Sequence, residues 1–164
     1  MELDTAVIQH IRALKETDFE LAYLAALTCE GLKPLSRWEK PLSEQDLDAL
    51  QQMGLQTRLV RRTVQTGKSV VEAVFSRRPA RLQIYLDRFA GRPVDKSPET
   101  VRVEGFLFGY PPCCVEQYVQ QPYAPNDLPE AKQKILFHWA CRGCAVTALL
   151  LPAYAKAHRM VEAS

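Results

Sequence analysis

The chain has 164 residues, of which 47% are hydrophobic and 24% are charged, the balance of a folded globular protein of one domain. There are 21 lysines and arginines and 19 aspartates and glutamates, so the net charge of +2 is too small to make nucleic acid the default partner. Five cysteines are the unusual feature of the composition, and we expect any chemistry to involve them.

Nothing in the sequence has the pattern of a targeting or membrane segment. Residues Met1 to Asp4 include acids where a secretory signal peptide has bases. The longest uncharged apolar stretch, Gly143–Ala155, contains Pro152 and is shorter than the roughly 20 residues that span a bilayer. We therefore expect a cytoplasmic protein that does not enter a membrane. Thiols stay reduced in that compartment, so clustered cysteines indicate metal ligands or redox groups.

Residues 1–54 have the pattern of a helical scaffold. Apolar residues recur at helical spacing before Thr17, which predicts a first helix. A capping box beginning at Thr17 predicts a second helix that Gly31 ends. A third helix is expected between Ser43 and Gly54.

Residues 55–96 are expected to form a basic hairpin followed by a basic helix. Leu55–Val64 and Val70–Phe75 are rich in β-branched residues and are separated by a turn-like linker, which predicts a β-hairpin. Pro79 then occupies the position of a first helical residue, and the helix is expected to end before Gly91.

Residues 97–164 contain four of the five cysteines on expected helices. Ser97, followed by proline and glutamate, starts one helix, and two prolines from position 111 start a second, short one. A long helix is expected from Asp127 through the second cysteine pair, kinked or broken near Pro152. The predicted fold is therefore a single α+β domain, mostly α-helical, with a central β-hairpin.

The four cysteines form two pairs, and a histidine precedes the second pair; the residues are Cys113 and Cys114, Cys141 and Cys144, and His138. On one helix, positions 138, 141 and 144 would share a face. If the pairs meet, a Cys₄ or Cys₃His shell suits zinc, and Cys₄ also suits an iron–sulfur cluster. Neighbouring side chains diverge, which a cluster tolerates better than a lone tetrahedral zinc. We therefore expect a metal ion or cluster, with His138 as a substitute ligand.

Other interpretations use the same thiols. In a thiol–disulfide protein, Cys113 or Cys114 would attack a substrate disulfide, and Cys141 or Cys144 would resolve the intermediate. Free cysteines also serve as small buried hydrophobes, the role expected of Cys29. A Cys-x-x-Cys in mid-helix counts against a thioredoxin-like fold, which places the motif between a strand and a helix.

The middle of the chain is strongly basic. Residues 56–102 hold 11 bases and four acids, whereas the remainder holds 10 bases and 15 acids. The candidate anion-binding residues are Arg58, Arg61, Arg62, Arg77, Arg78 and Arg81. They would bind a nucleic acid or a phosphorylated ligand through phosphates, or else form a solvated face paired with acids. Because no base-reading motif accompanies them, a small molecule or a protein is favoured as partner over nucleic acid.

Residues 102–116 place the sequence Gly109-Tyr110-Pro111-x-Cys113-Cys114-Val115 after an apolar segment. This segment resembles the central Gly-Tyr/Phe-Pro-x-Cys-Cys-Val motif of an uncharacterised prokaryotic family. The resemblance implies that the cysteine pair is a functional feature, and it brings no reaction with it. The two cysteine pairs are also similar in outline to cluster-binding domains of the heterodisulfide reductase type, in which a glycine stands in place of Val115.

Overall fold

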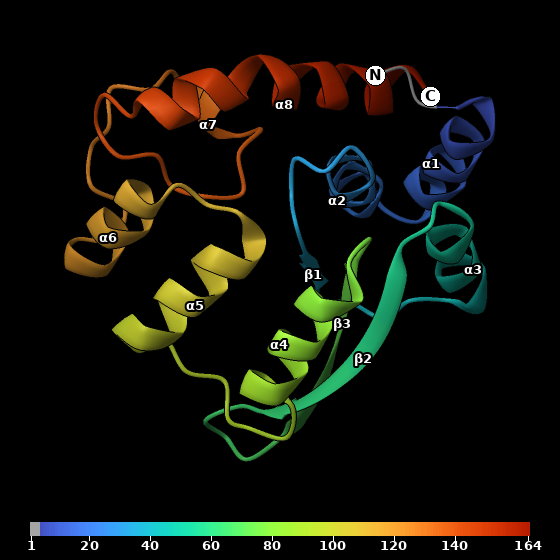
Figure 1. The fold of residues 1–164 in the computed structure, drawn as a ribbon, viewed down its shortest axis with the longest axis horizontal. Coiled ribbons are helices and arrows are strands. Elements are labelled where there is room, and N and C mark those ends of the chain that lie inside the picture. Colours follow the sequence, from blue (N-terminus) through green and yellow to red (C-terminus); the bar gives the residue numbers. More distant parts are fainter. Residues whose placement is uncertain (1–3) are drawn as a thin grey trace.

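The computed structural model describes residues 4–164, which form eight helices and three strands (Figure 1). Met1 to Leu3, on which part of the signal-peptide expectation depends, lie outside the described residues. In chain order the elements are α1 (Thr5–Thr17), α2 (Phe19–Cys29), β1 (Ser36–Trp38), α3 (Glu44–Gln52), β2 (Gln56–Thr63), β3 (Ser69–Ser76), α4 (Pro79–Phe89), α5 (Pro98–Phe108), α6 (Pro112–Gln120), α7 (Glu130–Gln133) and α8 (Ala145–Ala163). The predicted mostly helical α+β fold with a central hairpin is confirmed.

Local side-chain chemistry sets the helix starts in the first third of the chain. The Asp18 carboxylate caps α2 by accepting a hydrogen bond from the Glu20 N–H. Ser43 and Asp46 form a reciprocal capping box at the start of α3. The three helices predicted there are confirmed, because such caps act within a single turn and need no distant partner.

The sheet has the strand order β1-β3-β2, and both pairings are antiparallel. Strands β2 and β3 form the predicted hairpin, in register from Gln56 opposite Ser76 to Thr63 opposite Ser69. Strand β1 was not predicted, because its three residues are too few to show an alternating pattern. Its Trp38 pairs with Ala73, and the strand packs against α2.

Helix α2 is the centre of the larger hydrophobic core. Every residue from Leu21 to Cys29 is buried, which follows from a sequence that is apolar around the whole helix. Figure 1 shows α2 viewed along its axis, enclosed by α1, α8 and the sheet. A second core cluster forms where α4 and α5 cover the sheet, around Tyr85, Phe89 and Leu107.

The connection between α5 and α6 positions the first cysteine pair. Gly109 ends α5 with a φ of 75°, a left-handed conformation, and a Cβ there would lie 2.5 Å from Pro34. The chain then turns at Pro111, and Val115 of α6 packs against Gly105 of α5. Because Gly105 has no side chain, the two helices approach closely.

Helix α8 runs unbroken from Ala145 to Ala163, so of the kink or break expected near Pro152, the break does not occur. Proline removes one backbone donor and frees the carbonyl four residues earlier, that of Ala148. Both residues are solvent-exposed, so water can satisfy the freed carbonyl. The amino-terminal end of α8 lies beside α6 in Figure 1, whereas its other end reaches α1.

Candidate metal centre

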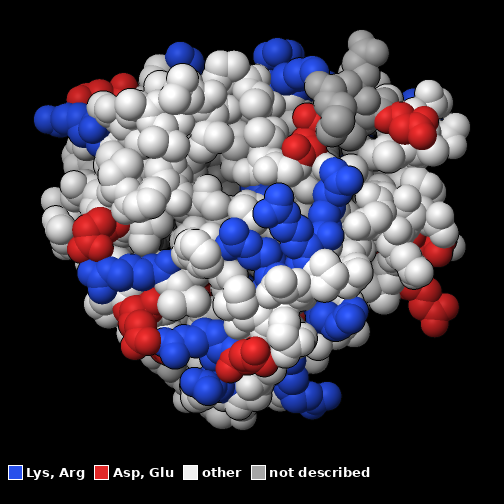
Figure 2. All heavy atoms as spheres, in the orientation of Figure 1, with Lys and Arg blue, Asp and Glu red and all other residues white. Residues whose placement is uncertain are grey.

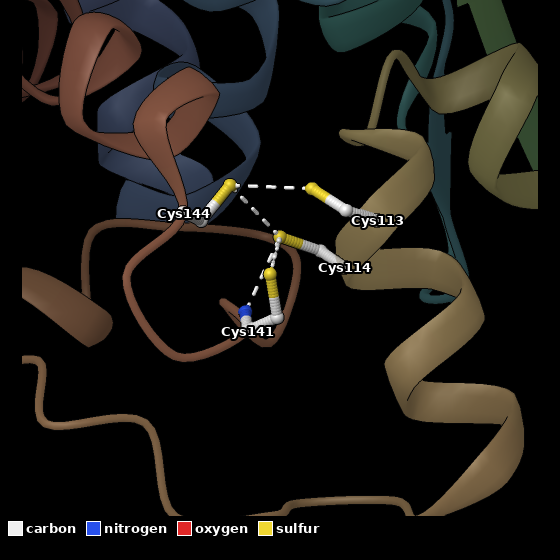
Figure 3. Close-up of side chains that lie close together, drawn as sticks. All are labelled: Cys113, Cys114, Cys141 and Cys144. Atoms are coloured by element: carbon white, nitrogen blue, oxygen red, sulfur yellow. Dashed lines mark hydrogen bonds between the residues drawn. The ribbon is translucent and has the colours of Figure 1, made fainter.

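The structure brings the two cysteine pairs together. Cys113 and Cys114 come from the first turn of α6, Cys141 from the irregular segment after α7, and Cys144 from the amino-terminal cap of α8. All four sulfur atoms lie within 4.8 Å of one another. Figure 3 shows the four side chains turned toward a common point between α6 and the chain that leads into α8. The sequence left open whether the two pairs meet; they do in the fold, and the group is able to hold a metal ion.

The sulfur atoms are close but not bonded. The Sγ of Cys114 lies 3.4 Å from that of Cys144 and 3.8 Å from that of Cys141. The Sγ of Cys113 lies 3.5 Å from that of Cys144. All four thiols are free, since a disulfide needs about 2.05 Å between its sulfurs.

The expected long helix through the second pair is wrong. Helix α7 covers only Glu130–Gln133, and irregular chain follows until α8 begins at Ala145. The Cys-x-x-Cys is thus a loop that leads into a helix, and its cysteines are not one helical face. The side chain of Gln133 bonds to the loop instead: its amide nitrogen donates to the His138 carbonyl, and its amide oxygen accepts from the Ala140 N–H. Such contacts depend on tertiary structure and leave no periodic pattern in the sequence.

The two adjacent cysteines of α6 both reach the group, although neighbouring side chains are expected to diverge. Cys113 is exposed and Cys114 is buried, yet both sulfurs approach Cys144. The second pair meets them from outside the helix, with the Cys141 sulfur 3.8 Å from that of Cys114 (Figure 3). Two neighbouring side chains can therefore belong to one group of sulfurs.

Backbone and hydroxyl donors point at the sulfurs. The N–H of Cys141 donates to the Cys114 sulfur at 3.3 Å, and the N–H of Thr147 donates to the Cys144 sulfur at 3.3 Å. The Thr147 hydroxyl lies 3.6 Å from the Cys114 sulfur. Because these donors stabilise negative charge on sulfur, the arrangement favours thiolates, the form of cysteine that binds metal. Sequence analysis missed Thr147, whose only sequence signal is its place in the first turn after Cys144.

The metal-free thiols differ in acidity. Burial raises the pKa of Cys144, but hydrogen bonds from Thr147 and the neighbouring cysteines outweigh it and lower the pKa to about 7. Burial raises the pKa of Cys141 to about 11 and that of Cys114 well above its usual range. A bound cation would reverse these increases, because it stabilises all of the thiolates together.

His138 is not part of the group of sulfur ligands. Its side chain is buried, and its Nε2 bonds to the Thr147 hydroxyl at 2.9 Å. Burial and the nearby Lys33 lower the pKa of His138 to about 4, so the imidazole is neutral at pH 7. His138 therefore contacts the cysteines through Thr147, and the role of substitute ligand is not supported. Its Nδ1 has no hydrogen-bond partner among the described residues.

The fifth cysteine lies elsewhere. Cys29 is buried in the core at the end of α2, and its sulfur lies 3.7 Å from the Met53 carbonyl oxygen. Burial raises the pKa of its thiol. The expected structural role of Cys29 agrees with this location.

The candidate anion-binding arginines do not form one surface. Arg58 and Arg61 are exposed on β2. Arg62, in contrast, is only 1% exposed and lies against Glu72 and Glu104. Arg62 therefore cannot contact a polyanion, and its inclusion is corrected. Strand geometry explains why Arg61 and Arg62 differ, because successive side chains of a strand point to opposite faces.

The remaining three arginines lie at the start of α4. Arg77 and Arg78 are exposed, and Arg81 is half-buried over the Phe106 ring. The Arg77 guanidinium donates to the Cys29 carbonyl at 2.9 Å. Figure 2 shows basic side chains gathered near the middle of this face, over the start of α4.

The chain was compared with family models, curated proteins and solved structures, and none of them matches it. Among the helices of residues 4–164, none has both the length and the hydrophobicity needed to cross a lipid bilayer. The group of four cysteines is thus the feature from which a function can be argued.

Proposed function

We propose that the protein binds one zinc ion in a tetrahedral shell formed by Cys113, Cys114, Cys141 and Cys144. The sulfur–sulfur distances are the observation that supports this most directly. Around a tetrahedral ion with zinc–sulfur bonds of about 2.3 Å, two ligand sulfurs are about 3.8 Å apart. The separations of 3.4, 3.5 and 3.8 Å, all within a limit of 4.8 Å, are close to that value.

The same distances disfavour an iron–sulfur cluster. In a [4Fe–4S] cluster each cysteine binds a different iron, so the four sulfurs are spread over the surface of the cluster. In a [2Fe–2S] cluster they are divided between two irons. A group that already surrounds a single point better matches one ion, and four thiolate ligands are typical of structural zinc.

Zinc would hold together a part of the chain with little regular structure. Between Gln121 and Cys144, α7 is the only helix, and it has four residues. The ion would tie this segment and α8 to the first turn of α6. With four protein ligands the shell has no open position for a substrate, so we assign the ion a structural role.

The test is the metal content of protein purified anaerobically without chelators. We expect one zinc per chain, no iron and no visible colour. Cys114→Ser and Cys144→Ser should lose the ion, whereas Cys29→Ser, a matched change outside the shell, should keep it. Protein that contains no stoichiometric metal would refute the metal centre. Protein that contains iron and acid-labile sulfide would show that the cysteines bind an iron–sulfur cluster and not zinc.

A thiol–disulfide activity is the second candidate, because Cys113 is exposed and its sulfur is 3.5 Å from that of Cys144. The Cys113 thiolate would attack a substrate disulfide, forming a mixed disulfide and releasing one substrate thiolate. Cys144 thiolate would then attack the Cys113 sulfur, releasing the second substrate thiolate and leaving a Cys113–Cys144 disulfide. An external dithiol would return the pair to the reduced state.

The two candidates differ in their requirement for metal-free thiols. With oxidised glutathione as substrate and dithiothreitol as reductant, turnover should require removal of zinc and should be lost in Cys113→Ser. Peptide mapping of the oxidised chain should then find the Cys113–Cys144 disulfide. If the metal-free wild-type chain shows no turnover and no such disulfide, this candidate is wrong.

A further inference from the structure

A cavity of about 780 Å³ lies next to the cysteine group, between α5, α6 and the irregular segment that precedes α8. This volume is within the range of small-molecule sites, about 300–1,000 Å³. Cys114 and His138 both line it, so one of the four clustered cysteines is part of the cavity wall. A structural ion beside a cavity of this size would fix the shape of a binding site.

Aromatic rings make up much of the lining. Six rings from three segments contribute, namely Phe108, Tyr110, Tyr118, Tyr123, Phe137 and Trp139. The Tyr123 ring packs edge-on against both Tyr118 and Trp139, with centroid distances of 5.2 and 5.4 Å. Rings arranged in this way offer flat apolar faces on which a planar ligand can stack.

Tyr123 itself is held in an unusual conformation. Its φ of 58° is in the left-handed region, which a bulky residue rarely adopts, and its side chain remains 65% exposed. An exposed aromatic residue gains little from burial within its own chain. A ligand that stacks against the ring would bury it and offset the cost of the backbone conformation.

Two hydrogen-bond acceptors in the cavity lack a donor from the described chain. One is the Nδ1 of His138, a side chain that is 7% exposed. The other is the second carboxylate oxygen of Glu104, whose Oε1 accepts a hydrogen bond from Arg37. The Nδ1 atom of His138 is buried, and a buried polar atom without a partner is costly, so a donor placed beside it would be stabilised. The Glu104 side chain is 20% exposed, so its second oxygen is open to a ligand.

The hydrogen bonds that join His138 to Cys114 through Thr147 determine which ring nitrogen of His138 can accept a hydrogen bond from a ligand. When Cys114 is a metal-bound thiolate, it accepts from the Thr147 hydroxyl, whose oxygen then accepts from the Nε2–H of His138. In that tautomer Nδ1 has no proton and carries a lone pair. This step rests on the proposed zinc site, whereas the cavity, the rings and Glu104 do not.

We infer that this cavity binds a planar heteroaromatic compound with amino or ring N–H groups, of about the size of a nucleoside. The aromatic rings stack against the faces of the compound, and His138 and Glu104 accept hydrogen bonds from its N–H groups. Among the other polar side chains of the lining, Asn126 and Gln133 bond to each other and to backbone atoms, and Lys134 pairs with Glu130.

The probe for the test is 2-aminopurine riboside, whose fluorescence is quenched when it stacks on aromatic rings. Titrating it with zinc-loaded protein should give saturable quenching. Purine riboside, which has the same rings without the amino group, should compete at least about tenfold more weakly, the cost of a buried acceptor left unpaired. Absence of saturable quenching, or equal competition by the two ribosides, would overturn the inference.

Variants locate the binding site. His138→Phe and Glu104→Gln should each weaken binding of the probe by about tenfold. His10→Phe on α1, outside the cavity, should leave it unchanged.

Circular dichroism and zinc content are measured on the same samples, because Glu104 also bonds to Arg37 within the fold. If folded, zinc-loaded His138→Phe binds the probe as tightly as the wild type does, the assignment of the acceptor is wrong. Zinc-free wild-type protein would instead refute the metal proposal.

Discussion

The cysteine region and the basic middle of the chain behave in opposite ways. Four cysteines that are spread over 113–144 and three segments meet within 4.8 Å. Arginines that follow one another closely between positions 58 and 81 separate onto a strand face, the sheet interior and a helix start. Proximity in sequence therefore says little about proximity in space for either group.

The difference between the two regions has a physical origin. Thiols that share a proton or an ion stabilise one another when they meet, so convergence lowers their free energy. Guanidinium groups repel one another, and each of the buried ones here is instead matched by acids or an aromatic face. The network of Arg37, Arg62, Glu72 and Glu104 is the clearest case, because it lies between α5 and the sheet.

The largest expected effect is on the cysteine side of this comparison. Removing zinc with a chelator should lower stability by at least about 4 kcal/mol, or roughly 10 °C in Tm, because the ion binds only the folded chain. Thermal unfolding followed by circular dichroism measures the change. The Cys114→Ser variant should have the low Tm of the zinc-free wild type before any chelator is added, and the chelator should not lower it further. An unchanged Tm in the wild type would contradict a structural ion.

On the basic side, Arg62→Ala should destabilise the fold by about 3 kcal/mol, because it leaves Glu72 and Glu104 buried without their partner. Arg61→Ala, on the same strand but exposed, should change stability by less than about 0.5 kcal/mol. Urea unfolding of both variants gives the comparison. Equal costs for the two substitutions would mean that Arg62 is not buried as described.

The close approach of α5 and α6, which positions the first cysteine pair, gives the next effect. A Cβ at position 105 would lie 2.4 Å from Val115, so Gly105→Ala should cost about 2 kcal/mol. In a Val115→Ala background the same change should cost much less. A double-mutant cycle in urea tests this, and identical costs in both backgrounds would show that the two residues do not touch.

The acidity of the thiols predicts how alkylation of the metal-free protein depends on pH. The lowered pKa of Cys144, about 7, means that its rate should rise about tenfold from pH 6 to 8 and then level off. The rate at Cys141 should go on rising toward pH 11, since burial raises its pKa. Mass spectrometry of iodoacetamide-treated peptides separates the sites. A Cys144 rate that still rises above pH 9 would contradict the hydrogen bonds from Thr147.

The smallest effect concerns the basic residues at the start of α4. Combined Arg77→Ala and Arg78→Ala substitution should make the protein elute at slightly lower salt from a phosphocellulose column, because exposed bases bind phosphate. Arg12→Ala with Arg159→Ala removes the same charge from α1 and α8 and serves as control. If both double variants elute together, the start of α4 has no special affinity for anions.

Secondary structure in this chain follows largely from the sequence. Asp18 and Ser43 cap their helices through bonds within one turn, and the β-branched runs on either side of a short turn specify the hairpin. The four cysteines were identifiable as a pair of pairs from their residue type and spacing alone. Each of these features depends on neighbours in the chain, which is why the sequence alone determines it.

Tertiary structure decided the rest. The irregular segment between α7 and α8 has no period to predict, so only the folded chain shows that Cys141 and Cys144 reach α6 and that His138 contacts them through Thr147. The burial of Arg62 depends on acids from β3 and α5. Contacts between residues distant in sequence are set by packing, and no local pattern encodes them. The composition and the spacing determined which thiols matter, and the fold determined that they surround a single point beside a cavity.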